Sequence, residues 1–126
     1  MKFFLSLLAV AAVSGSVPAA GAGSEAHPAA WTRPTEPFRI IGDVYYVGTA
    51  GIGAFLITGK QGHVLIDGGL PESAPLIAGN IRKLGFRLGD VKYLLINHAH
   101  YDHSGGLAQL KRQTSAKLMR YMEGVH

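Results

Sequence analysis

The chain has 126 residues, of which 48% are hydrophobic, and its 12 Lys and Arg against 8 Asp and Glu give a formal net charge of +4. That length allows the chain one small domain at most. Because the sequence has no cysteine, disulfides, thiolate metal ligands and a lipid-modified N-terminus are excluded. The basic residues are spread along the chain rather than clustered, so a nucleic-acid partner has little support.

The start of the chain predicts a secretory signal. Lys2 gives a basic beginning, and the apolar run that follows to Val13 is too short to span a bilayer. Small residues then offer an A-x-A-like cleavage site, and we expect cleavage after Ala22. Residues 1–22 would therefore be removed, and the mature protein would be periplasmic, with no stable membrane anchor.

Residues 23–37 predict an N-terminal arm that becomes ordered where it docks on the domain. They are rich in Ala, Pro and small polar residues, and Trp31 is their one large anchor. Trp31 has two interpretations: it forms a wall of a substrate cleft, or it simply docks the arm.

From Phe38 the pattern becomes typical of strands. Turn residues separate apolar, β-branched and aromatic segments, which predicts an antiparallel meander joined by hairpins. The predicted strands cover residues 38–41, 44–47, 54–58 and 63–67, and the turns cover 42–43 and 59–62.

The second part of the chain alternates helical and strand patterns. A helix capped by Ser73 and ended by Gly85 should cover one face of the sheet. Its apolar stripe consists of Ala74, Ile77, Ile81 and Leu84. The continuous apolar run 91–96 predicts an interior strand, and a second short helix begins at Leu107. The fold class is therefore α/β with a mixed sheet, and residues 38–126 form one domain.

The most informative stretch is the run of residues 98–103, which holds three histidines and one aspartate. In an extended segment His98 and His100 point to the same side and can bind one ion. Asp102 and His103 require the chain to turn and then project to a different place, which suits two neighbouring metals. Nitrogen and carboxylate ligands without thiolate fit zinc best, and iron or manganese less well.

The surroundings of this run support a built site. Gly105 and Gly106 let the backbone approach a ligand or a neighbouring turn, and the N-terminus of the following helix faces the site. Asp67 ends its strand before two glycines, where it either orients the ligand loop or a metal-bound histidine, or serves as an Asx-type turn residue. His63 is expected at the surface or across a strand, while His27 and His126 fit no metal spacing.

At these residues the chain resembles a known family. The H-x-H-x-D-H run at 98–103 and the strand end at 66–69 resemble the metallo-β-lactamase superfamily. The match from Trp31 to about Lys117 is closer to the mature N-terminal half of subclass B3 metallo-β-lactamases. Trp31 and residues 37–40, 44–53 and 80–86 carry that closer resemblance.

The resemblance implies an αβ/βα sandwich with a dinuclear zinc site at its edge, which hydrolyses small-molecule β-lactams. His98 and His100 would bind the first zinc, and Asp102 and His103 the second. Asp102 would also orient the attacking hydroxide, and the second zinc would stabilise the nitrogen released from the amide bond.

The resemblance also implies a further histidine for each zinc, in a second half that this chain lacks. We therefore expect the 126-residue chain to be a truncated or partial sequence that binds metal weakly and has little activity. Alternatives remain open: a lactonase or glyoxalase II-like thioesterase of the same superfamily, or a non-catalytic secreted metal-binding fragment. Such a fragment could also gain function by pairing with a complementary half or a second copy, and the sequence leaves its oligomeric state undecided.

Overall fold

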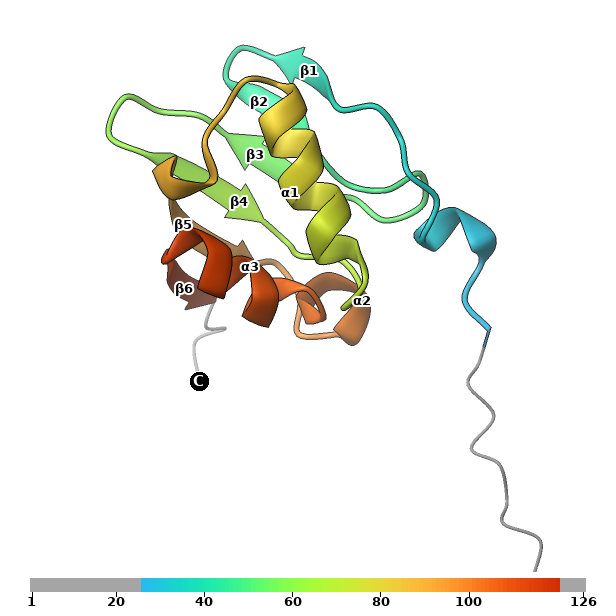
Figure 1. The fold of residues 1–126 in the computed structure, drawn as a ribbon. Helices are drawn as coiled ribbons and strands as arrows, with labels where there is room; N and C mark the ends of the chain where they lie inside the picture. Colours follow the sequence, from blue (N-terminus) through green and yellow to red (C-terminus); the bar gives the residue numbers. More distant parts are fainter. Residues whose placement is uncertain (1–25, 121–126) are drawn as a thin grey trace, which may run out of the picture.

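The computed structural model describes residues 26–120 of the chain (Figure 1). The predicted signal, its cleavage site at Ala22 and the final residue His126 lie outside the described residues. Between residues 26 and 120, no helix combines the length and the apolar character needed to cross a membrane.

A six-stranded mixed sheet forms the centre of the fold, as predicted, and its strands lie side by side in chain order. The first four strands are antiparallel neighbours, whereas the last three run parallel to one another. The strands are β1 (Phe38–Ile41), β2 (Val44–Tyr46), β3 (Phe55–Ile57), β4 (His63–Ile66), β5 (Val91–Ile96) and β6 (Lys117–Arg120). The meander and the interior position of β5 are therefore confirmed.

Two helices cover one face of this sheet (Figure 1). Parallel neighbours need crossover connections, and α1 (Ser73–Lys83) joins β4 to β5 while α3 (Leu107–Thr114) lies between β5 and β6. Three shorter elements complete the described part of the chain. They are η1 (Ala29–Trp31), η2 (Leu88–Asp90) and α2 (Tyr101–Ser104).

Helix α1 follows its predicted stripe but not its predicted cap. Ala74, Ile77 and Ile81 are almost completely buried against the sheet. Ser73 is the first residue of the helix rather than its cap, and its Oγ accepts a hydrogen bond from the Leu70 amide at 3.0 Å. The cap prediction was wrong because this hydroxyl turns back to close the preceding turn. Gly85 follows the helix with φ +88°, a left-handed conformation that ends it as predicted.

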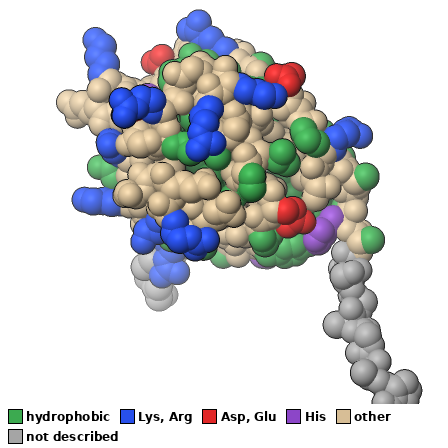
Figure 2. Space-filling model, viewed as in Figure 1, with side chains coloured by type: hydrophobic (Ala, Val, Ile, Leu, Met, Phe, Trp, Pro, Cys, Tyr) green, Lys and Arg blue, Asp and Glu red, His purple; other side chains and the backbone are tan. Residues whose placement is uncertain are grey.

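The two faces of the sheet differ in their cover. On the helix side, Leu56, Leu65 and Leu94 sit in one cross-strand row and are fully buried. On the other side, Tyr93 and Met119 are 42% and 51% exposed. No helix or second layer among residues 26–120 covers this apolar face. The outer surface of the helix layer faces water, and Lys and Arg side chains are scattered over this side of the molecule (Figure 2).

Candidate metal centre

The topology brings the sequence's candidate residues to one end of the sheet. β4 and β5 run parallel, so their carboxyl ends lie side by side. Asp67 follows β4, and its amide donates to the Leu95 carbonyl at 2.9 Å. Residues 97–103, here called the ligand loop, follow β5 and turn into α2. Asp67 is thereby placed directly behind the histidine-rich run.

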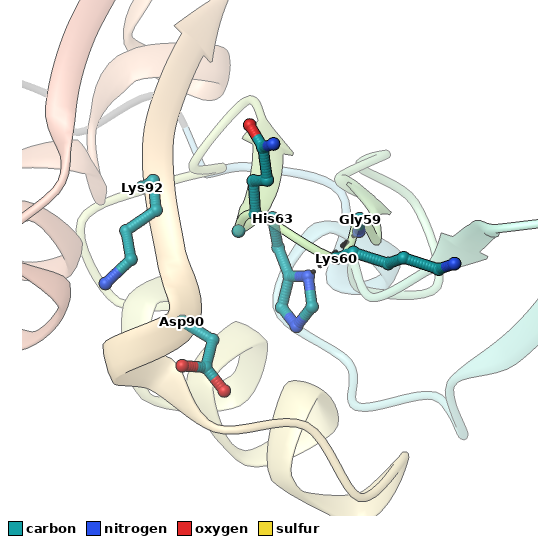
Figure 3. A pocket seen from close by; sticks show the side chains of 7 residues that line it. Gly59, Lys60, His63, Asp90 and Lys92 are labelled. Carbon is teal, nitrogen blue, oxygen red and sulfur yellow. Dashed lines mark hydrogen bonds between the residues drawn. The ribbon is translucent and has the colours of Figure 1, made fainter.

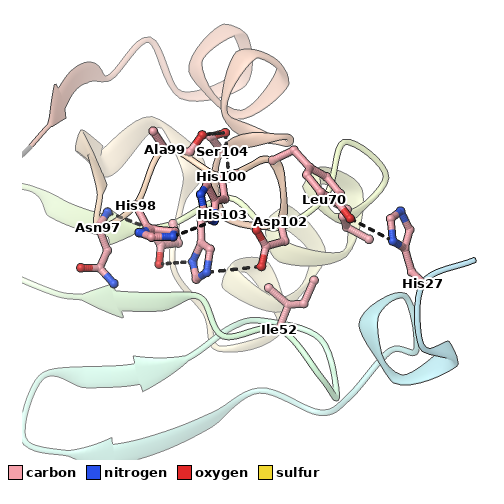
Figure 4. Close-up of polar contacts among 12 residues, drawn as sticks. His27, Ile52, Leu70, Asn97, His98, Ala99, His100, Asp102, His103 and Ser104 are labelled. Carbon is pink, nitrogen blue, oxygen red and sulfur yellow. Dashed lines mark hydrogen bonds and ion pairs between the residues drawn. The ribbon is translucent and has the colours of Figure 1, made fainter. Parts of the chain in front are cut away.

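His98 and His100 form the first donor pair. His98 Nε2 lies 2.8 Å from His100 Nδ1, and the two ring centroids are 4.1 Å apart (Figure 4). Two bare nitrogen lone pairs repel at this distance, so either one nitrogen carries a proton or both face a shared cation. Both residues are exposed, so solvent and ions can reach them.

Asp102 and His103 form the second donor pair, on α2. His103 Nε2 lies 3.5 Å from Asp102 Oδ2, and the His103 ring is 5.3 Å from that of His98. The turn needed to present this pair is α2 itself, in which the His103 amide donates to the His100 carbonyl at 2.9 Å. The second pair is therefore presented by α2 and the first by the segment before it, and the two pairs lie side by side.

Asp67 connects the ligand loop to the sheet. It is only 4% exposed, and both of its oxygens accept hydrogen bonds from that loop. Oδ1 accepts from the Asn97 amide at 2.9 Å, and Oδ2 lies 3.0 Å from His103 Nδ1. The carboxylate thus favours the tautomer with a proton on Nδ1, which leaves the lone pair of Nε2 free toward Asp102. Its φ of +66° is left-handed, a conformation that aspartate tolerates better than most residues.

The donors present fit zinc in chemical type. Imidazole nitrogen and carboxylate oxygen are ligands that zinc accepts, and it takes four of them in a tetrahedron. Within residues 26–120, however, no three His, Cys, Asp or Glu side chains converge as a metal-holding group. The described part of the chain therefore offers two pairs of donors, each of which would supply half of a tetrahedral set.

Trp31 lies on η1 and is half-buried. Its ring stacks on His27, with centroids 5.4 Å apart and planes 16° from parallel. His27 in turn lies with Nδ1 3.1 Å from the Tyr101 hydroxyl, inside the ligand loop. His27 could not be recognised from the sequence, because this contact joins residues 74 positions apart.

A loop between β2 and β3, residues 47–54, supports the arm. The Tyr46 hydroxyl donates to the Thr49 carbonyl and lies 3.2 Å from the Ile52 carbonyl oxygen. Burial raises the pKa of Tyr46 above its usual value of 10.0, so the phenol stays protonated as a donor well beyond neutral pH. The Ala50 amide of the same loop donates to the Arg33 carbonyl at 2.9 Å.

Hollows lie at both ends of the strands of the described sheet. An apolar hollow of about 460 Å³ adjoins the ligand loop on the open face, and it is lined by Ile66, Leu95, Ile96, Asn97, Met119 and Arg120. A polar hollow of about 290 Å³ lies at the other end, around the β3–β4 hairpin (Figure 3). There His63 Nδ1 accepts a hydrogen bond from the Gly59 amide at 3.2 Å, so this histidine braces the hairpin.

Replacing Asp67 by asparagine is expected to weaken zinc binding about 10- to 100-fold. Asparagine still tolerates the left-handed backbone and can accept from the Asn97 amide, but its NH₂ cannot accept the His103 Nδ1 proton. Competition with a chromophoric chelator measures the affinity. Asp43→Asn, in an exposed hairpin turn, is the matched control. An affinity equal to that of the unaltered chain would show that Asp67 does not orient His103.

Comparisons with known proteins agree with this geometry. The family model of the metallo-beta-lactamase superfamily matches residues 48–126, more than half of the chain. A subclass B3 metallo-beta-lactamase isolated from a soil metagenome library, MEM-A1, is 55% identical with a TM-score of 0.69, over 70% of this chain and 33% of its own. The class B3 di-zinc metallo-beta-lactamase LRA-12 from an Alaskan soil metagenome is 48% identical with a TM-score of 0.72, over 74% and 35% of the two chains.

A curated relative has a different activity in its name. The hydroxyacylglutathione hydrolase of Rhodopseudomonas palustris (strain BisB5) is 43% identical over 49 residues, which are 39% of this chain and 18% of that protein. The chain thus spans about a third of the solved relatives and less than a fifth of the curated one. The similarity to subclass B3 enzymes predicted from the sequence is confirmed, and the chain belongs to the metallo-beta-lactamase superfamily.

Proposed function

We propose that this chain supplies the first part of the active site of a periplasmic zinc enzyme that hydrolyses β-lactams. The observation that carries the proposal is the meeting of two donor pairs, His98 with His100 and Asp102 with His103, in front of the buried Asp67. The identity of 48–55% to subclass B3 structures over about 70% of the chain supports the lactam as substrate. Export rests on the pattern of residues 1–22 alone, and sequencing the N-terminus of the mature protein would test it.

Each residue has a distinct part in this proposal. His98 and His100 would hold one zinc, and Asp102 and His103 a second. Zinc, when bound, supplies a Lewis acid and lowers the pKa of water toward neutrality. The Asp102 side chain is 24% exposed, so it can accept a proton from an attacking water and fix the direction of attack. Asp67 keeps the His103 ring turned with Nε2 on the side of Asp102, where it is free to serve as a metal ligand.

Thioester hydrolysis is the second candidate, because a hydroxyacylglutathione hydrolase shares 43% identity over 49 residues. The same donor pairs would serve a thioester carbonyl as well as a lactam carbonyl, since both reactions add water to a polarised acyl carbon. The lactam remains the first choice because identity to the subclass B3 structures is higher and extends over almost twice as much of the chain.

The decisive experiment compares both substrates on two proteins. The first is the full 126-residue chain, and the second is a chimera in which this chain replaces the matched third of MEM-A1. We expect the chimera to hydrolyse a chromogenic cephalosporin in a chelator-sensitive reaction, and the chain alone to do so far more slowly, because each donor pair supplies only half of a zinc site. Hydrolysis of the thioester and not the cephalosporin would favour the second candidate. A zinc-loaded, folded chimera that hydrolyses neither would refute the proposal.

A further inference from the structure

The N-terminal arm reaches the ligand loop through a specific pair of side chains. His27 precedes η1, and its Nδ1 lies 3.1 Å from the hydroxyl of Tyr101 (dashed line at His27 in Figure 4). Tyr101 stands between the candidate ligands His100 and Asp102. The rings of His27 and Tyr101 are also in contact, with centroids 5.4 Å apart. A residue of the arm therefore contacts the ligand loop between its two donor pairs.

The arm is fixed at its other side to the body of the domain. Trp31, against which His27 stacks, packs on the loop 47–54: a Cβ added at Gly51 would lie 2.9 Å from Trp31 Cδ1. The hydrogen bond from the Ala50 amide to the Arg33 carbonyl adds a backbone link between that loop and the arm. The stack from Trp31 through His27 to Tyr101 therefore bridges a well-anchored loop and the ligand loop.

The ligand loop has little regular secondary structure of its own. Residues 97–100 are exposed and have no regular secondary structure, and α2 contains only four residues. Asp67 holds the loop at Asn97 and at His103, and the Gly68 amide donates to the His103 carbonyl at 2.7 Å. Between these two anchors, the Ser104 hydroxyl of α2 donates to the Ala99 and His100 carbonyls at 3.4 and 3.0 Å. Tyr101, also on α2, is where the arm meets this stretch. The contact with His27 therefore steadies α2, which holds the backbone of the first donor pair, and its loss should loosen that pair.

We propose that His27 and Tyr101 are positioning residues, through which the docked arm holds the ligand loop in the conformation that presents both donor pairs. This inference rests on the metal site of the proposed function. It makes arm docking and metal binding thermodynamically coupled, so each strengthens the other by the same factor. Neither side chain binds the metal in this proposal.

The single tryptophan of the chain makes the coupling measurable. Trp31 stacks on His27, so a change in how the arm docks should change the fluorescence of Trp31. Zinc titrated into the full chain is therefore expected to change that fluorescence. Tyr101→Phe removes only the hydroxyl, and His27→Phe keeps a stacking ring but loses the nitrogen that pairs with that hydroxyl. Each variant should weaken zinc binding roughly three- to tenfold, the range of one hydrogen bond. The double variant should be no weaker than either single one, because both remove the same contact.

Tyr93→Phe is the matched control, since it deletes a phenol hydroxyl from the open face of β5 and should leave zinc affinity unchanged. Amide hydrogen exchange of the zinc-free chain gives a second readout. Residues 98–105 should exchange faster in His27→Phe and in Tyr101→Phe, with exchange in α1 unaltered. The proposed function stands or falls separately, with the MEM-A1 chimera, and hydrogen exchange decides this inference even if the unaltered chain binds no zinc. Unchanged exchange in the ligand loop, or zinc affinities equal to that of the control, would overturn it.

Discussion

In the chimera with MEM-A1, replacing both His98 and His100 by alanine is expected to remove one bound zinc per molecule and to leave the second donor pair intact. A zinc site of four ligands binds with about 10–16 kcal/mol, or roughly 3 kcal/mol and a hundredfold in affinity for each ligand. Losing both members of the first pair should therefore weaken that site by a thousandfold or more. Metal content after gel filtration, together with chelator competition, measures the loss.

The reciprocal variant, Asp102→Asn with His103→Ala, distinguishes two separate zinc sites from a single zinc ion bound by all four side chains. If the pairs serve two metals, each double variant keeps the zinc of the other pair, as their separate contacts suggest. If all four side chains share a single ion, either double variant loses all of it. His63→Ala is the matched control, since that histidine accepts a hydrogen bond from Gly59 at the opposite end of β4. A loss of zinc in the control as well would mean that the histidines act non-specifically.

The sheet and its main helices could be predicted because local pattern and tertiary burial agree. Ile77 and Ile81 occupy a period that only a helix presents to one face, and the continuous run of β5 is typical of a strand between two neighbours. The short helix α2 could not be predicted in this way, since four residues are too few to show a period of 3.6. Its existence followed only indirectly, from the turn that Asp102 and His103 require.

In the candidate site, too, residues marked by a local sequence pattern could be predicted, and residues brought there by a long-range contact could not. Asp67 could be suspected from sequence because it ends a strand whose parallel neighbour leads into the histidine run. His27 could not, because nothing in its own segment indicates that the arm crosses to Tyr101. The contact between the arm and the ligand loop depends on how the arm packs on the loop 47–54. No short sequence motif predicts that packing.

The close approach of two glycine-containing turns beneath the site leads to the second large prediction. A Cβ added to Gly106 would lie 2.2 Å from the carbonyl oxygen of Gly68 and 3.0 Å from that of Leu70. These are backbone atoms of the turn that begins at Asp67, and they cannot move aside as a flexible side chain would. Gly106→Ala should therefore destabilise the fold by about 3 kcal/mol, and lower Tm by roughly 12–24 °C in a domain of this size.

Gly79→Ala is the control that isolates the backbone clash from the general cost of replacing glycine. Gly79 lies inside α1 with open space where a Cβ would point, so alanine there should stabilise the helix by about 0.5–1 kcal/mol. Thermal unfolding of the two variants should thus shift Tm in opposite directions. Because the same turns seat Asp67 behind His103, Gly106→Ala should also weaken zinc binding at temperatures where the chain remains folded. Equal Tm values for the two variants would show that the turns at Gly68 and Gly106 do not pack backbone against backbone.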